Sequence, residues 1–226
     1  MTRPAAAPTA IATRAVGGLG TSIGGGALLG AAAWWSDQLG YPAGLLIPAN
    51  AIGAWLAVAF VLGASARTIP TGALRGLLGL LSAVVVYYVL FALLGVGFRA
   101  IGASHAATVW GLVALIAGPL LGGSGAVWRH GTGWPRAIGV AVLATALIGE
   151  GVVFGGSRLV RVDQLGNDPG AVLFLVEIVI GLVLPLVLLR GRERLRGYAA
   201  TIALAVIAGA AIGPVTALIR GIADRF

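Results

Sequence analysis

A succession of long apolar runs constrains this chain more than any other feature of its sequence. A helix that spans a bilayer needs about 20 consecutive apolar residues, and several runs approach that length. Of the residues, 59% are hydrophobic and 10% are charged, whereas a soluble domain carries about 25% charged residues. We therefore expect an all-α, polytopic transmembrane helical bundle embedded in a lipid bilayer.

The apolar runs predict about seven spans in one domain. Residues 1–14 contain proline, threonine and arginine without an apolar core, so we expect a flexible N-terminal tail before a single helical domain at 15–226. The 37 glycines predict closely packed helices, because small residues let helix backbones approach each other. The first run is rich in glycine, and six spans remain if it does not cross. The predicted spans are 15–35, 49–66, 72–95, 106–128, 137–154, 169–189 and 198–219.

The arginines predict the orientation of the bundle. With seven spans, ten arginines fall on the side of the N-terminus and five on the other side. Positive charge marks the cytoplasmic side, so we expect a multi-pass protein of the cytoplasmic membrane with its N-terminus inside. The ten are Arg3, Arg14, Arg67, Arg75, Arg129, Arg136, Arg190, Arg192, Arg194 and Arg196.

The composition excludes several kinds of chemistry. The chain has no cysteine and no lysine, which excludes disulfides, a cysteine-bound metal and a Schiff base. His105 and His130 have no ligand-spaced partner, and no phosphate-binding motif is present, so we expect no metal and no other cofactor. The net charge of +8 comes from arginines distributed over the loops. That pattern is typical of membrane topology, and we expect no nucleic acid partner.

Two acidic residues lie deep inside predicted spans. Glu150 is thirteen residues past Ala137, about 20 Å into a hydrocarbon layer of about 30 Å. Glu177 is eight residues past Pro169, about 12 Å below the outer boundary and at a similar depth. An ionisable group at such a depth faces a partner, a cavity or a substrate. The alternative is a structural role, in which an arginine or a backbone donor is the partner.

Aromatic side chains accompany these acids. Several lie at a similar depth, where lining a pocket competes with the alternative of an interfacial aromatic belt. Asp37 is a third candidate acid, although a helix cap or a solvated residue is the simpler interpretation. The candidate catalytic residues are Glu150, Glu177 and Asp37. The candidate substrate-binding residues are Trp34, Asn50, Trp55, Tyr87, Tyr88, Phe91, Trp110 and Phe174.

Acids and aromatic rings in an apolar pocket favour two kinds of function. Removal from water disfavours the charged form of a carboxyl group, so an intramembrane acid holds a proton that it can donate. Aromatic faces stabilise a nearby cation. Together they suit an enzyme that protonates an olefin or epoxide on a lipophilic isoprenoid and guides the carbocation through ring closure. They equally suit a proton-coupled transporter, or a substrate-binding membrane subunit, for an apolar or cationic small molecule.

Three stretches, NAIGAWLAVAFVLGA, GLLGLLSAVVVYYVL and WGLVALIAGPLLGGSGAVWR, represent the alanine- and glycine-rich, lysine-free character of the chain. In length, span number and composition the chain resembles the small integral-membrane terpene cyclases of actinobacterial indole-sesquiterpenoid pathways. It is also similar to a large group of actinobacterial multi-pass membrane proteins. The first resemblance implies acid-initiated cyclisation of a prenylated, indole-bearing substrate without magnesium. It contains no motif that assigns a role to a particular residue.

Overall fold

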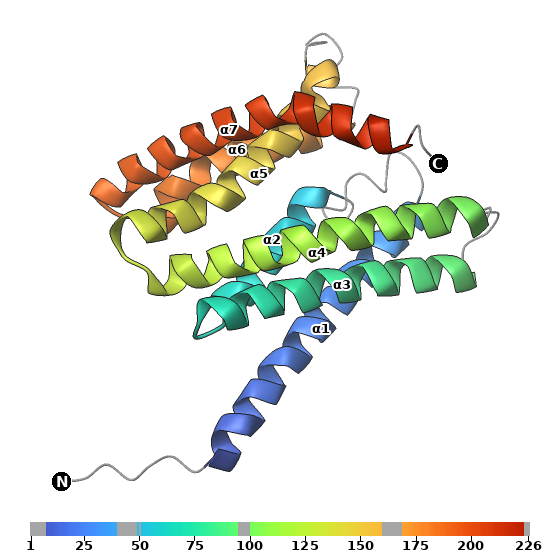
Figure 1. The fold of residues 1–226 in the computed structure, drawn as a ribbon, viewed down its shortest axis with the longest axis horizontal. Helices are drawn as coiled ribbons and strands as arrows, with labels where there is room; N and C mark the ends of the chain where they lie inside the picture. Colours follow the sequence, from blue (N-terminus) through green and yellow to red (C-terminus); the bar gives the residue numbers. More distant parts are fainter. Residues whose placement is uncertain (1–7, 40–48, 50, 95–99, 160–168, 224–226) are drawn as a thin grey trace.

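The computed structural model describes residues 8–39, 49, 51–94, 100–159 and 169–223, and this part of the chain forms seven helices (Figure 1). The prediction of an all-helical bundle is confirmed. The first helix begins inside the stretch that we predicted as a flexible tail, and residues 1–7 lie outside the described residues. The helices are α1 (Pro8–Gln38), α2 (Ile52–Ala64), α3 (Ile69–Leu94), α4 (Ala100–His130), α5 (Gly133–Leu159), α6 (Pro169–Leu188) and α7 (Arg192–Ala223).

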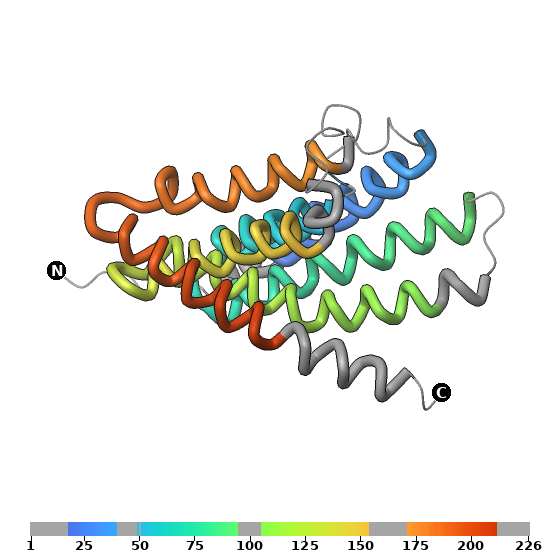
Figure 2. The backbone as a smooth tube through the Cα atoms, turned by 90° about the horizontal axis from the view of Figure 1, so that it is seen from above, coloured from blue at the N-terminus to red at the C-terminus, as the bar shows by residue number. Residues whose placement is uncertain are grey.

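The helices form two groups that meet along α4 and α5. Helices α1 to α4 make one group, in which α3 packs against both α1 and α4, and α2 packs against α4. Helices α5 to α7 make the other group, with α5 against both α6 and α7. Figure 1 shows α1 crossing α3 obliquely, while Figure 2 shows the long helices following the long axis. The turns α2–α3, α4–α5 and α6–α7 lie at the same end of the bundle.

Five of the helices are long and apolar enough to cross a membrane, so the chain is a multi-pass membrane protein. They are α3, α4, α5, α6 and α7. Helix α2 has 13 residues. It is therefore about 20 Å long, short of the roughly 30 Å of a hydrocarbon layer. The second predicted span, 49–66, thus contains a helix that is too short to cross the hydrocarbon layer. Large apolar side chains on the outer faces, such as Leu195, Ile202 and Val206, are more than half exposed and suit contact with lipid.

Glycines bring the helix backbones together, as their abundance predicted. Gly26 and Gly30 of α1 face the backbone of α3, and a methyl group on either would overlap its carbonyl oxygens. Gly76 and Gly122 bring α3 and α4 equally close. A Cβ atom added to Gly122 would lie 2.9 Å from the Gly76 Cα atom and would overlap the carbonyl oxygen of Gly72. These contacts involve backbone atoms, which cannot move aside without separating the helices.

The substitution Gly122→Ala should therefore lower the free energy of unfolding by about 1–3 kcal/mol, the usual cost of overpacking. Gly111→Ala, on the same helix, is the matched control because the added methyl group would meet nothing within 4 Å. That control should be neutral or stabilising by up to about 1 kcal/mol, since alanine is the better helix former. Thermal unfolding in detergent micelles compares the two variants. Equal stabilities would contradict the close packing of α3 on α4.

Candidate functional site

Helix α2 begins inside the bundle without a capping side chain of its own. Its N-cap residue, Ala51, is extended and makes no side-chain hydrogen bond. The first amide groups of a helix have no partner within it. Here the Ile52 backbone N–H donates to Oε1 of Glu150 at 2.8 Å, and the Gly53 amide also stabilises this carboxylate. Glu150 on α5, which is 98 residues further along the chain than Ile52, thus caps the start of α2.

Glu177 of α6 lies beside Glu150 at the same turn. Both glutamates are buried, with exposed fractions of 7% for Glu150 and 4% for Glu177. A Cβ atom built on Gly53 would lie 2.9 Å from Glu177 Oε1 and 3.3 Å from Glu150 Oε2. These two oxygens are therefore both close to a single point on α2. The structure thus buries both predicted glutamates and brings them together at Gly53, although neither is among the residues that line the cavity described below.

Three oxygens of this carboxylate pair have no hydrogen-bond partner among the described residues. They are Oε2 of Glu150 and both carboxylate oxygens of Glu177. A buried polar atom without a partner costs free energy, and a buried charge costs more. Glu150 has the backbone donor that the structural interpretation required. Among the described residues, Glu177 has no comparable donor, and the side chains of Arg158 and Arg161 lie outside the described residues. A proton or a cation at this site would stabilise these three oxygens.

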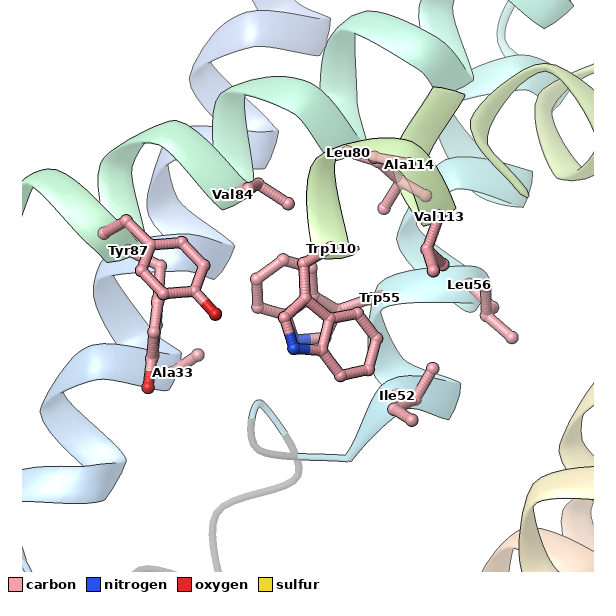
Figure 3. A pocket seen from close by; sticks show the side chains of 11 residues that line it. Ala33, Ile52, Trp55, Leu56, Leu80, Val84, Tyr87, Trp110, Val113 and Ala114 are labelled. Carbon is pink, nitrogen blue, oxygen red and sulfur yellow. The ribbon is translucent and has the colours of Figure 1, made fainter. Parts of the chain in front are cut away.

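An aromatic cavity of about 140 Å³ lies on another face of the same turn (Figure 3). The first turn of α2 contributes Ile52, Trp55 and Leu56 to its wall, and α1, α3 and α4 supply the rest. Trp55 is held in place by a hydrogen bond of 2.9 Å from its indole Nε1 to the carbonyl oxygen of Ala49. The cavity is lined by Ala33, Ile52, Trp55, Leu56, Leu80, Val84, Tyr87, Tyr88, Trp110, Val113 and Ala114.

Four of the predicted aromatic residues meet in this wall. They are Trp55, Tyr87, Tyr88 and Trp110. The Trp55 and Tyr87 rings meet edge to face with centroids 6.4 Å apart, and the Tyr87 and Tyr88 centroids are 4.9 Å apart. Such edge-to-face pairs add to the stabilisation that burial provides. The convergence of the four aromatic residues from three helices, α2, α3 and α4, makes the cavity a site that favours apolar or cationic molecules.

The remaining candidates lie around the cavity or apart from it. Asp37 is exposed at the end of α1, and its Oδ2 accepts a hydrogen bond of 2.5 Å from the Tyr87 hydroxyl. Phe91 stacks on Tyr87 at 6.1 Å, behind the wall. Trp34 packs against Trp35, while Phe174 belongs to α6; neither is a lining residue. The predicted contact Asn50 lies outside the described residues.

The predicted single pocket is two neighbouring sites. Neither Glu150 nor Glu177 lines the aromatic cavity, although their depth suggested it. The first turn of α2 separates them, with Gly53 facing the glutamates and Ile52 facing the cavity. The sequence analysis did not include Ile52 and Gly53 among the candidate site residues, because the sequence contains only a weak indication of their roles. The available signal was a glycine in the first turn of a helix that follows Pro48 and has no capping side chain.

Comparison with known proteins finds a single family. A family model described as a family of unknown function, DUF6518, matches residues 9–221. No curated protein and no solved structure matches the chain. The matched range contains both sites.

The close approach at Gly53 gives a direct test of the carboxylate site. Gly53→Ala places a methyl group 2.5 Å from Leu147 Cδ2 and against Glu177, so it should lower the free energy of unfolding by about 1–3 kcal/mol. The control Gly149→Ala, next to Glu150, adds a methyl group with nothing within 4 Å. It should change stability by less than about 1 kcal/mol. Thermal unfolding of both variants in detergent is the measurement, and a fully stable Gly53→Ala would show that α2 does not approach the glutamates this closely.

Proposed function

This chain belongs to DUF6518, a family of unknown function, and we propose that it is a small proton-coupled transporter for an apolar or cationic small molecule. One observation carries the proposal: the buried carboxylate pair and the aromatic cavity share the first turn of α2. Ile52 donates its amide hydrogen to Glu150 and also lines the cavity. A change in the charge of the pair is therefore transmitted directly to the cavity wall.

The start of α2 inside the bundle supports a transport function. Interrupted helices whose ends lie within the bilayer form the ion and substrate sites of many transporters. Ionisable residues inside a membrane act in proton relays and substrate pathways. The site combines both features, because α2 begins within the bundle and its first amides meet Glu150. A scaffold would need neither a helix that begins inside the bundle nor two buried carboxylates.

The lining of the cavity indicates the class of cargo. Aromatic and aliphatic side chains of the described residues line it, and none of these lining residues is charged. A cation over a tryptophan or tyrosine face gains about 0.5–2 kcal/mol. The volume of about 140 Å³ is below the roughly 300–1,000 Å³ of drug-sized ligand sites. A compact molecule is therefore a better cargo than a long prenylated chain.

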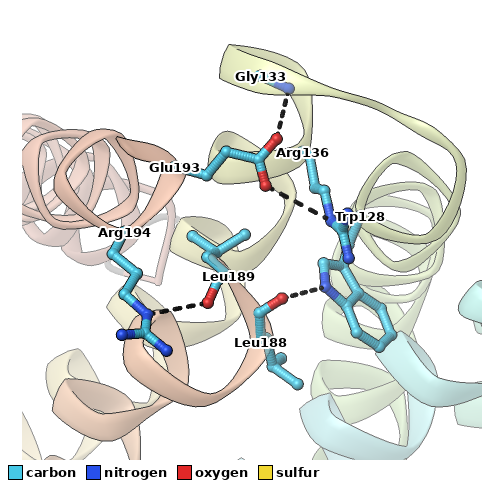
Figure 4. Close-up of polar contacts among 7 residues, drawn as sticks. All are labelled: Trp128, Gly133, Arg136, Leu188, Leu189, Glu193 and Arg194. Atoms are coloured by element: carbon cyan, nitrogen blue, oxygen red, sulfur yellow. Dashed lines mark hydrogen bonds and ion pairs between the residues drawn. The ribbon is translucent and has the colours of Figure 1, made fainter. Parts of the chain in front are cut away.

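The basic end of the bundle supports the proposed orientation. Arg136, Arg194 and Arg196 lie where α5 and α7 begin, and Glu193 links these helices through the Gly133 amide at 2.8 Å and Arg136 at 4.0 Å (Figure 4). The Arg196 guanidinium lies over the Trp134 ring, 5.8 Å from its centroid. We place this end, and the N-terminus, on the cytoplasmic side of the cytoplasmic membrane.

The transport prediction uses vesicles that contain the purified full-length protein and carry a pH gradient. The compact quaternary cation tetramethylammonium should cross faster with the protein than without it. Glu150→Gln and Glu177→Gln should each reduce the gradient-driven rate at least about tenfold, because each removes an acid of the buried pair on which proton coupling depends. Trp55→Ala should weaken cargo affinity by about 2- to 30-fold, the equivalent of the cation–π contribution. The control Glu193→Gln removes an acid outside both sites and should transport normally. Gradient-independent rates in all variants would contradict the proposal.

A membrane-embedded terpene cyclase is the second candidate. The observation that favours it is the hydrogen bond between the Tyr87 hydroxyl and Asp37, because it places an acid directly behind an aromatic wall. Glu150 does not line the cavity, so Asp37, acting with Tyr87, would be the proton donor to a prenylated, indole-bearing substrate. Incubation of membranes with farnesylated indoles, with product masses recorded, distinguishes the candidates. Cyclised products that disappear in Asp37→Asn would favour the enzyme.

A further inference from the structure

We infer that the Glu150–Glu177 pair holds one exchangeable proton, which Glu177 carries, while Glu150 remains a charged cap on α2. The inference rests on the proposed function for its use in coupling, but the assignment itself follows from the hydrogen-bond partners of each carboxylate. It gives the two glutamates different roles. One fixes the start of a helix, and the other takes up and releases the proton.

Glu150 is the partner whose negative charge is compensated. It receives the Ile52 amide at 2.8 Å and is further stabilised by the amide of Gly53. The N-terminal end of a helix also carries a partial positive charge, which favours an anion there. Protonation of Glu150 would weaken both effects. Of the two carboxylates, Glu150 is therefore the one whose charge costs less free energy.

Glu177 is the partner that needs a proton. Its exposed fraction is 4%, and within the part of the chain that the structure describes neither of its oxygens has a hydrogen-bond partner. An ionised carboxylate only accepts hydrogen bonds, whereas a protonated one also donates. The three unmet oxygens of the pair are all acceptors. One proton on Glu177 supplies the missing donor and removes the repulsion between two like charges in a dry environment.

The surroundings favour a proton over a metal ion. In the described residues, no group of three or more histidine, cysteine, aspartate or glutamate side chains comes together. Space beside the two carboxylates is also limited. The Cβ position on Gly53 that lies close to both of them is only 2.5 Å from Leu147 Cδ2. A proton needs neither further ligands nor additional space. Uptake consists of transfer from hydronium to the Glu177 carboxylate, with release of one water molecule.

No other charged side chain of the described residues approaches the pair from the packed helices. Helix α2 carries none, and Glu177 is the only charged residue of α6. The other described charged or histidine side chains of α5, α4 and α7 lie near the basic end, at Arg136, at Arg129 and His130, and at the start of α7, except His105, which is exposed near the start of α4. The side chains of Arg158 on α5 and Arg220 on α7 lie outside the described residues. The protonation state of Glu177 is thus controlled mainly by Glu150 and by burial. Release of its proton leaves two negative charges at the turn whose other face lines the cavity.

Infrared spectroscopy of the full-length protein in lipid nanodiscs tests this assignment. A protonated carboxyl group in an apolar site gives a carbonyl stretching band that ionised carboxylates lack. At neutral pH we expect one such band in the native protein, lost in Glu177→Gln and retained in Glu150→Gln and in the control Glu193→Gln. Circular dichroism verifies that each variant is folded. Where Glu177→Gln does not fold, Glu177→Asp replaces it and should shift the band.

The outcomes separate this inference from the transport proposal. A native protein without the band, a band lost only in Glu150→Gln, or a band unaffected by Glu177→Gln or Glu177→Asp would each overturn the assignment. A Glu177 band in a protein that moves no cation in vesicles would refute transport and leave the proton site standing. Gradient-driven transport without the band would refute the proton site alone.

Discussion

The hydrogen bond from the Ile52 amide to Glu150 is the interaction on which both sites depend. A helix that starts inside a membrane protein exposes its first amides where no water is available, and each unmet group costs several kcal/mol. Ala51, the N-cap residue, makes no capping hydrogen bond through its side chain. Glu150 supplies the acceptor from a distant helix. The position of α2, the approach of Gly53 to the glutamates and the wall of the aromatic cavity all follow from this contact.

Close backbone packing makes the contact possible. Glycines on α3 and α4 bring these helices together, and Gly63 of α2 packs against the backbone of Gly122 on α4. With one end of α2 fixed in this way, its first turn reaches α5 and α6. The arrangement costs little side-chain entropy, because glycine has no side chain to order. It also leaves the larger residues of α2, including Trp55, to line the cavity.

Depth was predictable from the sequence, but direction around the helix was not. Counting residues placed Glu150 about 20 Å from the basic end, which matches the length of α2, whose first turn it caps. The same counting placed Trp55, Tyr87, Tyr88 and the glutamates in one pocket. In a soluble protein the apolar face of a helix identifies the side that packs on the core, because the opposite face is polar. In a membrane protein the lipid-facing side and the core-facing side are both apolar, so this signal is absent. The sequence therefore carried little information that Gly53 and Ile52 face different sites.

Amide hydrogen exchange at the start of α2 tests most directly whether Glu150 fixes this helix. Residues 51–56 of the full-length protein in nanodiscs are compared between the native chain, Glu150→Gln and Glu177→Gln. We expect faster exchange at Ile52 and Gly53 in Glu150→Gln, because the charge-assisted acceptor is lost, and little change in Glu177→Gln. Unchanged exchange in Glu150→Gln, or the same acceleration in both variants, would contradict the account.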